Sequence, residues 1–537
     1  MMSPVEVPRD TVPHITPTTQ PYGGPAAASS SKRSVSTTET VHGAEDMVDE
    51  KLESGTAVKG PAVFRGFWHE MLFIMIVTSA QLITQVNLGN TIIPIAAVAE
   101  GLGIPNKPAD QSWFVASYSC TVGAFVLITG RLGDIYGRKN LFLIGWLWLA
   151  IFSLAAGFVR NHIAFDVLRA LSGIGPSIMM PNAAALLAGA WPDTRSRHDQ
   201  SRKMLAFCVF GAIAPGGYVL GGAWGAAVIE TGLPWGWIYW SIAIVCIGLA
   251  VASWAVIPNT QGLNGRGEGT VDYLGSVVGV TGLILVFVSL NGGPTFGWSA
   301  PQTPILLVVG LLLLGLFCHI ENKVAHPILP MSIFKSPTFV AVAISLCAGW
   351  MSFGMFQYYQ PHFLMEFRGV SPLQTSLQLL PCAVIGLVAA VLAVILLPRV
   401  PGYVIFGASM ISFFIGQTML AFTPVEQTYW AMTFPTCIII CFGPDLSFAC
   451  ASLIASDKLK PEEQGVAGSF INTIVNYSVA IGLALAGNVE VNVNNGGRDK
   501  LAGYRGAHYL GMGLAAMGMF FTAVFWKGMA KRHTSGD

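Results

Sequence analysis

The sequence predicts an all-α polytopic membrane protein with 14 transmembrane helices. Its 537 residues are 53% hydrophobic and only 11% charged, with a net charge of +1, whereas soluble domains carry about 25% charge. The uncharged stretches suit helices of about 20 residues that cross a bilayer, and positive charge alternates between the loops that join them. This composition excludes a disordered chain, a nucleic-acid binder and an ordinary soluble enzyme.

The predicted helices follow an N-terminal tail. Residues 1–66 are rich in Ser, Thr, Pro and Gly, so we expect a disordered cytoplasmic tail without a cleavable signal peptide. The uncharged windows are 71–99, 111–130, 140–159, 170–192, 204–229, 231–265, 273–320, 336–365, 369–398, 400–425, 427–444, 464–489 and 506–526. The window 273–320 has room for two helices, with a turn at 291–294, where the sequence reads Asn-Gly-Gly-Pro.

The charge of the loops predicts how the helices cross the membrane. With both termini in the cytoplasm, the inner loops and the C-terminal tail hold sixteen Lys and Arg residues, against six in the outer loops. Cytoplasmic loops of membrane proteins carry such an excess, and an odd number of helices would destroy the alternation. The resulting plan is a group of six helices in 67–257, two additional helices in 258–336, a second group of six in 337–527 and a cytoplasmic tail in 528–537.

All nine cysteines fall in the predicted helices, which excludes a disulfide framework in the loops. Cys437 and Cys441 lie one helical turn apart, a spacing that also suits a metal pair. We identify no His or carboxylate partner at the same depth, so we interpret both thiols as packing residues. The sequence predicts no metal site and no cofactor.

The loop after the second predicted helix carries a motif of glycines and charges. The run 130–139 reads Gly-Arg-Leu-Gly-Asp-Ile-Tyr-Gly-Arg-Lys, and its glycines permit a tight reversal at the membrane surface. We expect a gating loop, bounded by Gly130 and Gly137, in which Asp134, Arg138 and Lys139 exchange partners when helices move. The run resembles the cytoplasmic loop signature of the major facilitator superfamily, G-x-L-x-D-x-x-G-R-K.

This resemblance implies two six-helix bundles that rock about a site near the middle of the membrane. Fourteen helices, two of them inserted between the bundles, point to the drug:proton antiporter branch of the family. Three stretches look like the fungal aminotriazole- and boron-resistance type within that branch. They are residues 169–182, 442–448 and 472–482.

The fifth predicted helix contains a second signature. The run 214–222 reads Ala-Pro-Gly-Gly-Tyr-Val-Leu-Gly-Gly and is similar to the antiporter motif of the family, with alanine in place of its first glycine. We expect Pro215 to bend the helix, and Gly217, Gly221 and Gly222 to let a neighbouring backbone approach closely. Within the family this motif implies export, with protons flowing inward as the counter-flux.

Two departures from the branch bear on proton coupling. The first helix commonly has an acid where this chain has Gln85, and an amide does not titrate near neutral pH. The arginine of the usual Trp-Arg-Trp before the sixth helix is replaced by Gly236. The coupling residues of the best-known members therefore do not transfer to this chain.

Few ionisable groups remain as proton carriers inside the predicted helices. Asp445, near the middle of the twelfth helix, is the first candidate because acids inside membranes are usually functional. Alternatively, an acid after a Gly-Pro pair stabilises the first turn of a restarted half-helix. Asp166 and Arg169, three residues apart, form either a proton switch or a static ion pair. We interpret Glu490, at the outer end of the thirteenth helix, as a solvated acid.

Uncharged polar residues gather in three predicted helices. Buried amides need partners in protein or water, so we expect these residues to line a cavity, with hydrogen bonds between helices as the alternative. The candidates are Gln81, Gln85, Asn87, Asn90, Tyr358, Tyr359, Asn472 and Asn476. A cavity of amides, phenols and tryptophan suits a neutral or amphipathic organic substrate, and it also fits boric acid.

The leading functional hypothesis is a proton-coupled exporter of toxic, drug-like or self-made organic molecules. The alternative is a transporter of a small inorganic solute such as boric acid or ammonium. An enzyme is disfavoured because HExxH, GK[ST] and GxSxG motifs are absent, and a sensor would need a long folded tail. We expect a monomer that lies in the lipid bilayer and binds a small-molecule substrate and protons. We expect no nucleic-acid partner. The expected location is the plasma membrane, with the vacuolar membrane as the alternative.

Overall fold

The structure is a computed structural model that describes residues 64–105, 107–191, 197–259, 271–324, 327–458, 464–524 and 526. Nearly all of the two predicted tails lies outside these residues. In the described part the chain forms helices and no β-strands, and fourteen helices are long and apolar enough to cross a membrane. The predicted all-α class and the predicted number of spans are confirmed.

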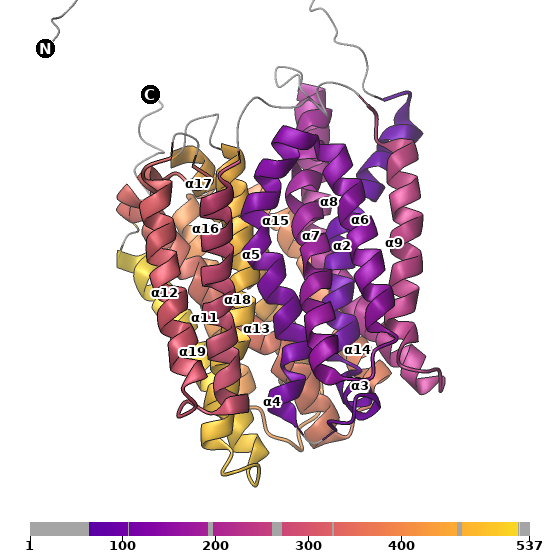
Figure 1. The fold of residues 1–537 in the computed structure, drawn as a ribbon, viewed down its shortest axis with the longest axis vertical. Helices are drawn as coiled ribbons and strands as arrows, with labels where there is room; N and C mark the ends of the chain where they lie inside the picture. The colour runs from indigo at the N-terminus through magenta and orange to yellow at the C-terminus, as the bar shows by residue number, and fades with distance from the viewer. Residues whose placement is uncertain are drawn as a thin grey trace, which may run out of the picture. The chain divides into compact units, whose positions relative to one another are not determined.

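The first six spanning helices alternate in direction along the chain (Figure 1). They are α2 (Phe67–Ile92), α5 (Trp113–Tyr136), α6 (Arg138–Ala156), α7 (His162–Ala190), α8 (Arg197–Glu230) and α9 (Trp237–Val256). Two short helices, α3 (Ile95–Gly101) and α4 (Pro108–Gln111), lie between α2 and α5.

Two more spanning helices, α11 (Tyr273–Phe296) and α12 (Gln302–Glu321), precede the last six. The 3-10 helix η1 (Met331–Lys335) leads into the last group. That group comprises α13 (Pro337–Arg368), α14 (Pro372–Gln378) with α15 (Leu380–Leu396), α16 (Gly402–Ala421), α17 (Thr433–Lys458), α18 (Gln464–Val493) and α19 (Lys500–Val524). Helices α14 and α15 together make one span.

The two ends of this helical assembly carry different features. One end holds the start of α2 and the turn at Gly137 between α5 and α6, and we call it the Gly137 end. The other holds α3, α4 and the start of α14, and we call it the α3–α4 end (Figure 1).

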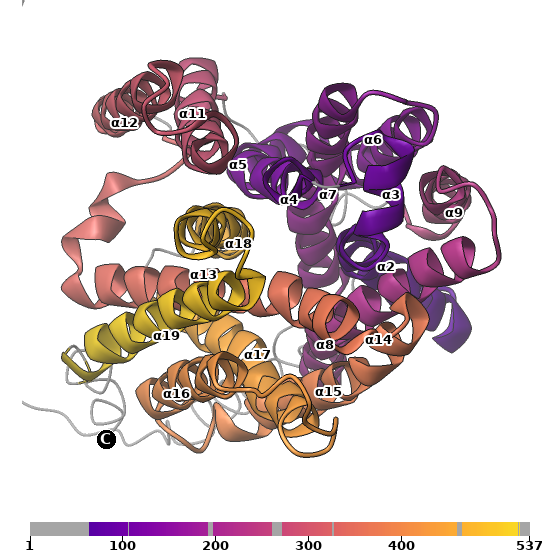
Figure 2. The same cartoon turned by 90° about the horizontal axis from the view of Figure 1, so that it is seen from below.

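The spanning helices pack in two groups (Figure 2). In the first group α2 packs on α8, and α5 and α6 pack on α7; in the second, α16 packs on α17, and α13 and α16 pack on α19. Two seams join the groups, one between α5 and α18 and one between α8 and α15. Helix α11 lies against both α5 and α18, and α12 packs mainly on α11.

The turn between α11 and α12 differs from the prediction. Instead of turning at 291–294, α11 continues to Phe296, and the chain turns at Gly297, whose φ of 86° suits glycine. Pro294 cannot donate the backbone hydrogen bond that Leu290 O would receive. Asn488 Nδ2 of α18 donates to that oxygen instead, at 2.7 Å. A neighbouring helix thus lets the proline remain inside α11.

The same arrangement recurs at two other prolines. In α7, the Ser177 carbonyl, freed by the proline four residues later, accepts from Thr129 Oγ1 of α5 at 2.5 Å. In α13, Pro361 frees the Gln357 carbonyl, which accepts from the Tyr218 hydroxyl of α8 at 2.6 Å. Lipid offers no hydrogen bonds, so carbonyls freed inside a membrane need such partners.

Candidate functional site: a cavity between the two groups

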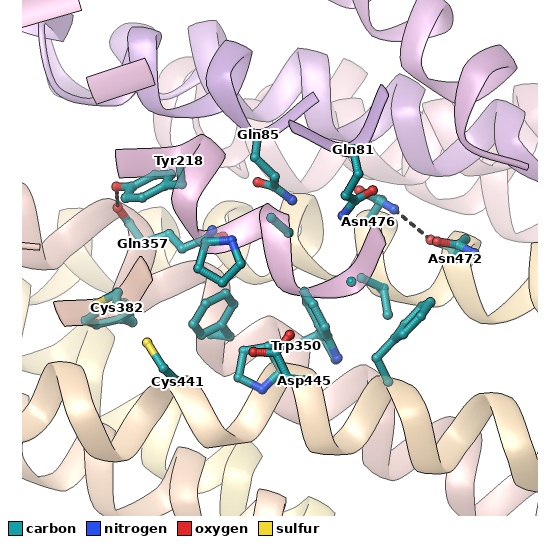
Figure 3. A pocket seen from close by; sticks show the side chains of 18 of the residues that line it. Gln81, Gln85, Tyr218, Trp350, Gln357, Cys382, Cys441, Asp445, Asn472 and Asn476 are labelled. Atoms are coloured by element: carbon teal, nitrogen blue, oxygen red, sulfur yellow. Dashed lines mark hydrogen bonds between the residues drawn. The ribbon is translucent and has the colours of Figure 1, made fainter. Parts of the chain in front are cut away.

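A cavity of ≈ 100 Å³ lies between the two groups of helices (Figure 3). Helices α2, α7 and α8 of the first group line it, together with α13, α15, α17 and α18 of the second. Because both groups contribute, any relative motion of the groups changes the shape of this cavity.

Polar side chains from three helices meet in the cavity (Figure 3). Gln81 and Gln85 come from α2, Asn472 and Asn476 from α18, and Asp445 from α17. The spacing of four residues places each amide pair on one face of its helix. In the described part of the chain, the Oε1 atoms of both glutamines are buried without a hydrogen-bond partner. These amides can therefore serve a bound solute or water.

Asp445 is the one ionisable carboxyl or basic group among the described residues that line the cavity. Its Oδ2 atom is buried and has no hydrogen-bond partner in the described structure. A Cβ atom built at Gly386 of α15 would lie 3.4 Å from this oxygen. Helix α17 runs without a break from Thr433 to Lys458 with Pro444 inside it. The alternative role for Asp445, at the start of a half-helix, is therefore wrong.

Aromatic side chains form much of the remaining wall. They are Phe210, Tyr218, Trp350, Phe353, Phe356 and Phe448. The Trp350 indole donates to Ser447 Oγ at 3.2 Å, which orients its ring. Such a wall favours neutral or amphipathic organic molecules over anions, because the described lining residues include no Lys or Arg.

Four of the predicted lining residues lie elsewhere. Asn87 and Asn90 are fully buried among the helices of the first group and do not line the cavity. Tyr358 and Tyr359 line a second cavity, nearer the α3–α4 end. Their neighbour Gln357 lines the central cavity, because each residue of a helix is rotated by about 100° from the last.

The sequence interpretation overlooked most of the aromatic wall. Trp350, Phe353 and Gln357 recur at spacings of three and four on α13 and face the cavity together. This spacing was visible in the sequence. However, the same spacing describes any helix face that packs against protein, so it does not by itself identify a cavity.

Arg169 does not belong to the cavity. It is 1% exposed, and it donates to Phe114 O at 3.1 Å and to Asn87 O at 2.9 Å. Its guanidinium lies 4.5 Å from the centre of the Tyr118 ring. No ion pair joins it to Asp166 among the described residues, and Asp166 Oδ1 has no hydrogen-bond partner there. The predicted static pair is therefore not formed, and Arg169 fastens α7 to α2 and α5.

The predicted gating loop connects several helices at the Gly137 end. Gly137 has a φ of 99°, which lets the chain reverse between α5 and α6. Arg138 pairs with Asp134 at 3.1 Å and reaches the Ala185 carbonyl of α7. The Lys139 ammonium donates to the Trp254 carbonyl near the end of α9 at 3.0 Å.

Gly130 places the start of this loop against the second group of helices. A Cβ atom built there would lie 2.7 Å from Ser469 Oγ of α18. The loop region therefore meets one of the two seams between the groups.

The predicted antiporter motif, residues 214–222, packs α8 tightly on α2. A Cβ atom at Gly217 would crowd the Leu82 carbonyl, and one at Gly221 would overlap the Val86 carbonyl, so only glycine fits there. Pro215 lines the cavity beside Asp445. Gly222 faces α14, where a Cβ atom would lie 2.9 Å from Ser376 Oγ.

Fourteen spanning helices that enclose a cavity between two groups define a multi-pass membrane transporter. The chain belongs to the Major Facilitator Superfamily, whose sequence profile matches residues 75–483. The family resemblance of the 130–139 loop is thereby confirmed.

Individual relatives place the chain in the efflux branch of this family. The chain is 39% identical to efflux pump terJ of Aspergillus terreus, covering 87% of this chain and 89% of the relative. It is 34% identical to the aminotriazole resistance protein of Saccharomyces cerevisiae, covering 90% of each. It is also 41% identical to the low affinity ammonium transporter of S. cerevisiae, covering 85% of this chain and 88% of the relative.

Proposed function

We propose that this protein is a proton-coupled exporter of small organic molecules in the plasma membrane. The observation that carries the proposal is the central cavity, in which amides and aromatic rings surround one carboxyl, Asp445, with no cation among the described lining residues. Such a wall suits a neutral or amphipathic organic solute, and an unpaired carboxyl inside a membrane suits proton exchange. The names of the Aspergillus efflux pump and the yeast aminotriazole resistance protein support the same function.

The transport cycle follows from two orientations of the two groups of helices. We place the Gly137 end in the cytoplasm, because the loops at that end carry most of the Lys and Arg. Protons then reach Asp445 while the α3–α4 end is open, and the substrate reaches the cavity while the Gly137 end is open. One chain contains both groups of helices, so a monomer is sufficient for this cycle.

A second candidate function is the transport of a small inorganic solute such as ammonium or boric acid. It is favoured by the yeast ammonium transporter and by the unpaired glutamine oxygens of the cavity. The two candidates differ in what they require of the aromatic wall. Only an organic substrate needs Trp350 and Phe353.

Replacement of Asp445 tests proton coupling directly. In liposomes with an imposed pH gradient, we expect Asp445→Asn to slow gradient-driven transport on the order of 100-fold, while the amount of inserted protein stays the same. Glu100→Gln is the control, because this exposed carboxyl of α3 does not line the cavity. Wild-type transport by Asp445→Asn would remove this carboxyl from the coupling mechanism.

A substrate panel separates the two candidate functions. The same liposomes are given hydrophobic dyes, a triazole, ammonium and boric acid. Gradient-dependent movement of the organic compounds, reduced by Trp350→Ala, supports the exporter. Movement of ammonium or boric acid alone, unchanged by Trp350→Ala, selects the second candidate.

A further inference from the structure

A second cavity, of ≈ 340 Å³, lies toward the α3–α4 end. We call it the Glu490 cavity; it is lined by Lys107 and Asp110 beside α4, Asn291 of α11, Tyr358 and Tyr359 of α13, and Glu490 of α18. It thus lies at the seam between α5 and α18, covered by α11. Unlike the central cavity, it contains charged groups of both signs.

One face of α18 connects the Glu490 cavity to the central cavity. Asn472 and Asn476 line the central cavity, and Gly487 and Glu490 line the Glu490 cavity. A small void of ≈ 20 Å³ lies between them, bounded by Asn476 and Val479. Together with Leu483, which also lines the Glu490 cavity, these positions recur at intervals of three or four residues, which places them on one face of the helix. Three spaces in a row therefore follow α18 from Asp445 toward the α3–α4 end.

The small void shares several of its lining residues with the central cavity. Gln85, Trp350, Gln357 and Asn476 border both spaces. On the other side, Val479 borders the void and Leu483 borders the Glu490 cavity. These two apolar side chains of α18 stand between the polar spaces in the present conformation.

The carboxyl of Glu490 is available for proton exchange. Its Oε2 atom accepts from the Tyr359 hydroxyl at 2.8 Å. The charged neighbours across the cavity, Lys107 and Asp110, pair with each other at 3.7 Å. The ring of Tyr358 completes this side of the cavity. In the described structure Glu490 thus has a hydroxyl partner and no cation bound to it.

The groups that approach Glu490 from α19 and the end of α13 are also engaged elsewhere. Gly503 of α19 packs on the Glu490 side chain. Lys500 and the Tyr504 hydroxyl both donate to Glu366, the hydroxyl at 2.7 Å. His508, behind Tyr359, bonds Gln417 at 2.8 Å. Glu366 is therefore neutralised by its partners, whereas Glu490 is not.

We propose that Glu490 is the carboxylate that accepts protons from the outer aqueous phase, and that the α18 face delivers them to Asp445. This inference rests on the proposed proton-coupled function. Hydronium gives its proton to the Glu490 carboxylate, and the proton leaves through water along α18, so Glu490 becomes ionised again as Asp445 becomes neutral. The path opens when the groups separate at the α5–α18 seam and water passes Val479 and Leu483.

Removal of the carboxylate tests this role. We expect Glu490→Gln to slow proton influx, followed with a pH dye inside liposomes, on the order of tenfold. The dependence of the rate on external pH should be lost, while binding of a hydrophobic dye, followed by the fluorescence of the dye itself, is unchanged. Glu366→Gln is the matched control: it lies at the same end of the helices but does not line the Glu490 cavity, and it should retain the wild-type pH profile.

The outcomes separate this inference from the proposed function. Wild-type proton influx by Glu490→Gln at every external pH, together with loss of coupling in Asp445→Asn, would overturn the α18 path alone. Retained coupling in Asp445→Asn would remove Asp445 as the proton acceptor, whereas a wild-type protein that transports none of the organic compounds in response to a pH gradient would overturn the proposed function itself. Glu490→Asp, which restores a carboxylate, should recover most of the rate, and equal loss in both variants would indicate a structural role for Glu490.

A cysteine introduced into the Glu490 cavity gives an independent test of the path. A Cβ atom at Gly487 meets only the Pro294 ring, at 3.7 Å, so Gly487→Cys fits without strain. We expect a membrane-impermeant thiol reagent added outside to modify it and to slow proton influx. Asn492→Cys, exposed on another face of α18, should be modified without effect. A Gly487→Cys protein that the reagent leaves unmodified, or modifies without slowing proton influx, would contradict the path.

Discussion

Arg169 shows how a positive charge can be buried in a membrane protein with carbonyl and aromatic partners. Its guanidinium donates to the Phe114 and Asn87 carbonyls and lies over the Tyr118 ring. Two backbone carbonyls and an aromatic face replace the water that the cation would lose. The side chain therefore stabilises the contact between three helices.

Replacement of Arg169 should affect stability before it affects coupling. Arg169→Leu removes the charge-assisted hydrogen bonds to the Phe114 and Asn87 carbonyls and the contact with the Tyr118 ring, so we expect a loss of about 3 kcal/mol in the free energy of unfolding, measured by denaturation in mixed micelles. Asp166→Asn, which removes no observed hydrogen bond, should leave this free energy unchanged. If the Arg169→Leu protein is as stable as the wild type but has lost proton coupling, Arg169 takes part in proton transfer rather than in helix packing.

Single residues also show what sequence alone can predict of the site. The structure places Gln81 and Gln85, like Asn472 and Asn476, in the lining of the central cavity, and a one-turn spacing gives each pair a shared helix face that can be read from the sequence. Asn87 was misplaced because its partner, Arg169, is 82 residues away. A polar residue serves equally well in a cavity or in a buried network, and only the tertiary structure distinguishes the two.

At the scale of helices, prolines act through their neighbours. Three carbonyls freed by prolines accept hydrogen bonds from side chains of other helices, at Ser177, Leu290 and Gln357. The uncharged windows predicted the number of spans, because lipid tolerates few charges. They misplaced the end of α11, because a Gly-Gly-Pro run normally predicts a turn. The residue that donates to the freed Leu290 carbonyl, Asn488, lies far away in the sequence.

A double-mutant cycle measures this dependence. Asn488→Leu removes the donor to the Leu290 carbonyl, so we expect a loss of about 1 to 3 kcal/mol in the free energy of unfolding. With Pro294→Ala already present, the new backbone N–H satisfies that carbonyl, and the same change should cost about 1 kcal/mol less. Equal losses in the two backgrounds would show that Asn488 acts through its other contacts.

At the scale of the whole bundle, two hydrogen bonds hold the groups together toward the α3–α4 end. The Tyr218 hydroxyl of the first group donates to Gln357 O of the second, and Leu373 N donates to Glu230 Oε1 at 3.0 Å. Both must break for the groups to separate at that end. They favour the conformation in which the central cavity is closed toward α3 and α4.

Loss of one such bond should shift the equilibrium between the two orientations. Tyr218→Phe removes about 1 kcal/mol from the closed state, so the open fraction should rise about fivefold. Spin labels at Leu233 and Leu377, exposed in different groups, report the separation once the native cysteines are replaced by alanine. Tyr239→Phe, which loses only a bond to Thr91 inside the first group, should leave the distance distribution unchanged.

Helix α11 has a role beyond adding a span. Its residues Asn291, Pro294 and Thr295 form one wall of the Glu490 cavity, and α12 packs on α11. Helices α11 and α12 therefore separate a cavity that contains charged groups from acyl chains, which could not solvate an ionised carboxylate. A protein of twelve spans that lacked these two helices would need apolar residues along this edge. The additional pair of helices therefore allows charged residues at the seam between α5 and α18.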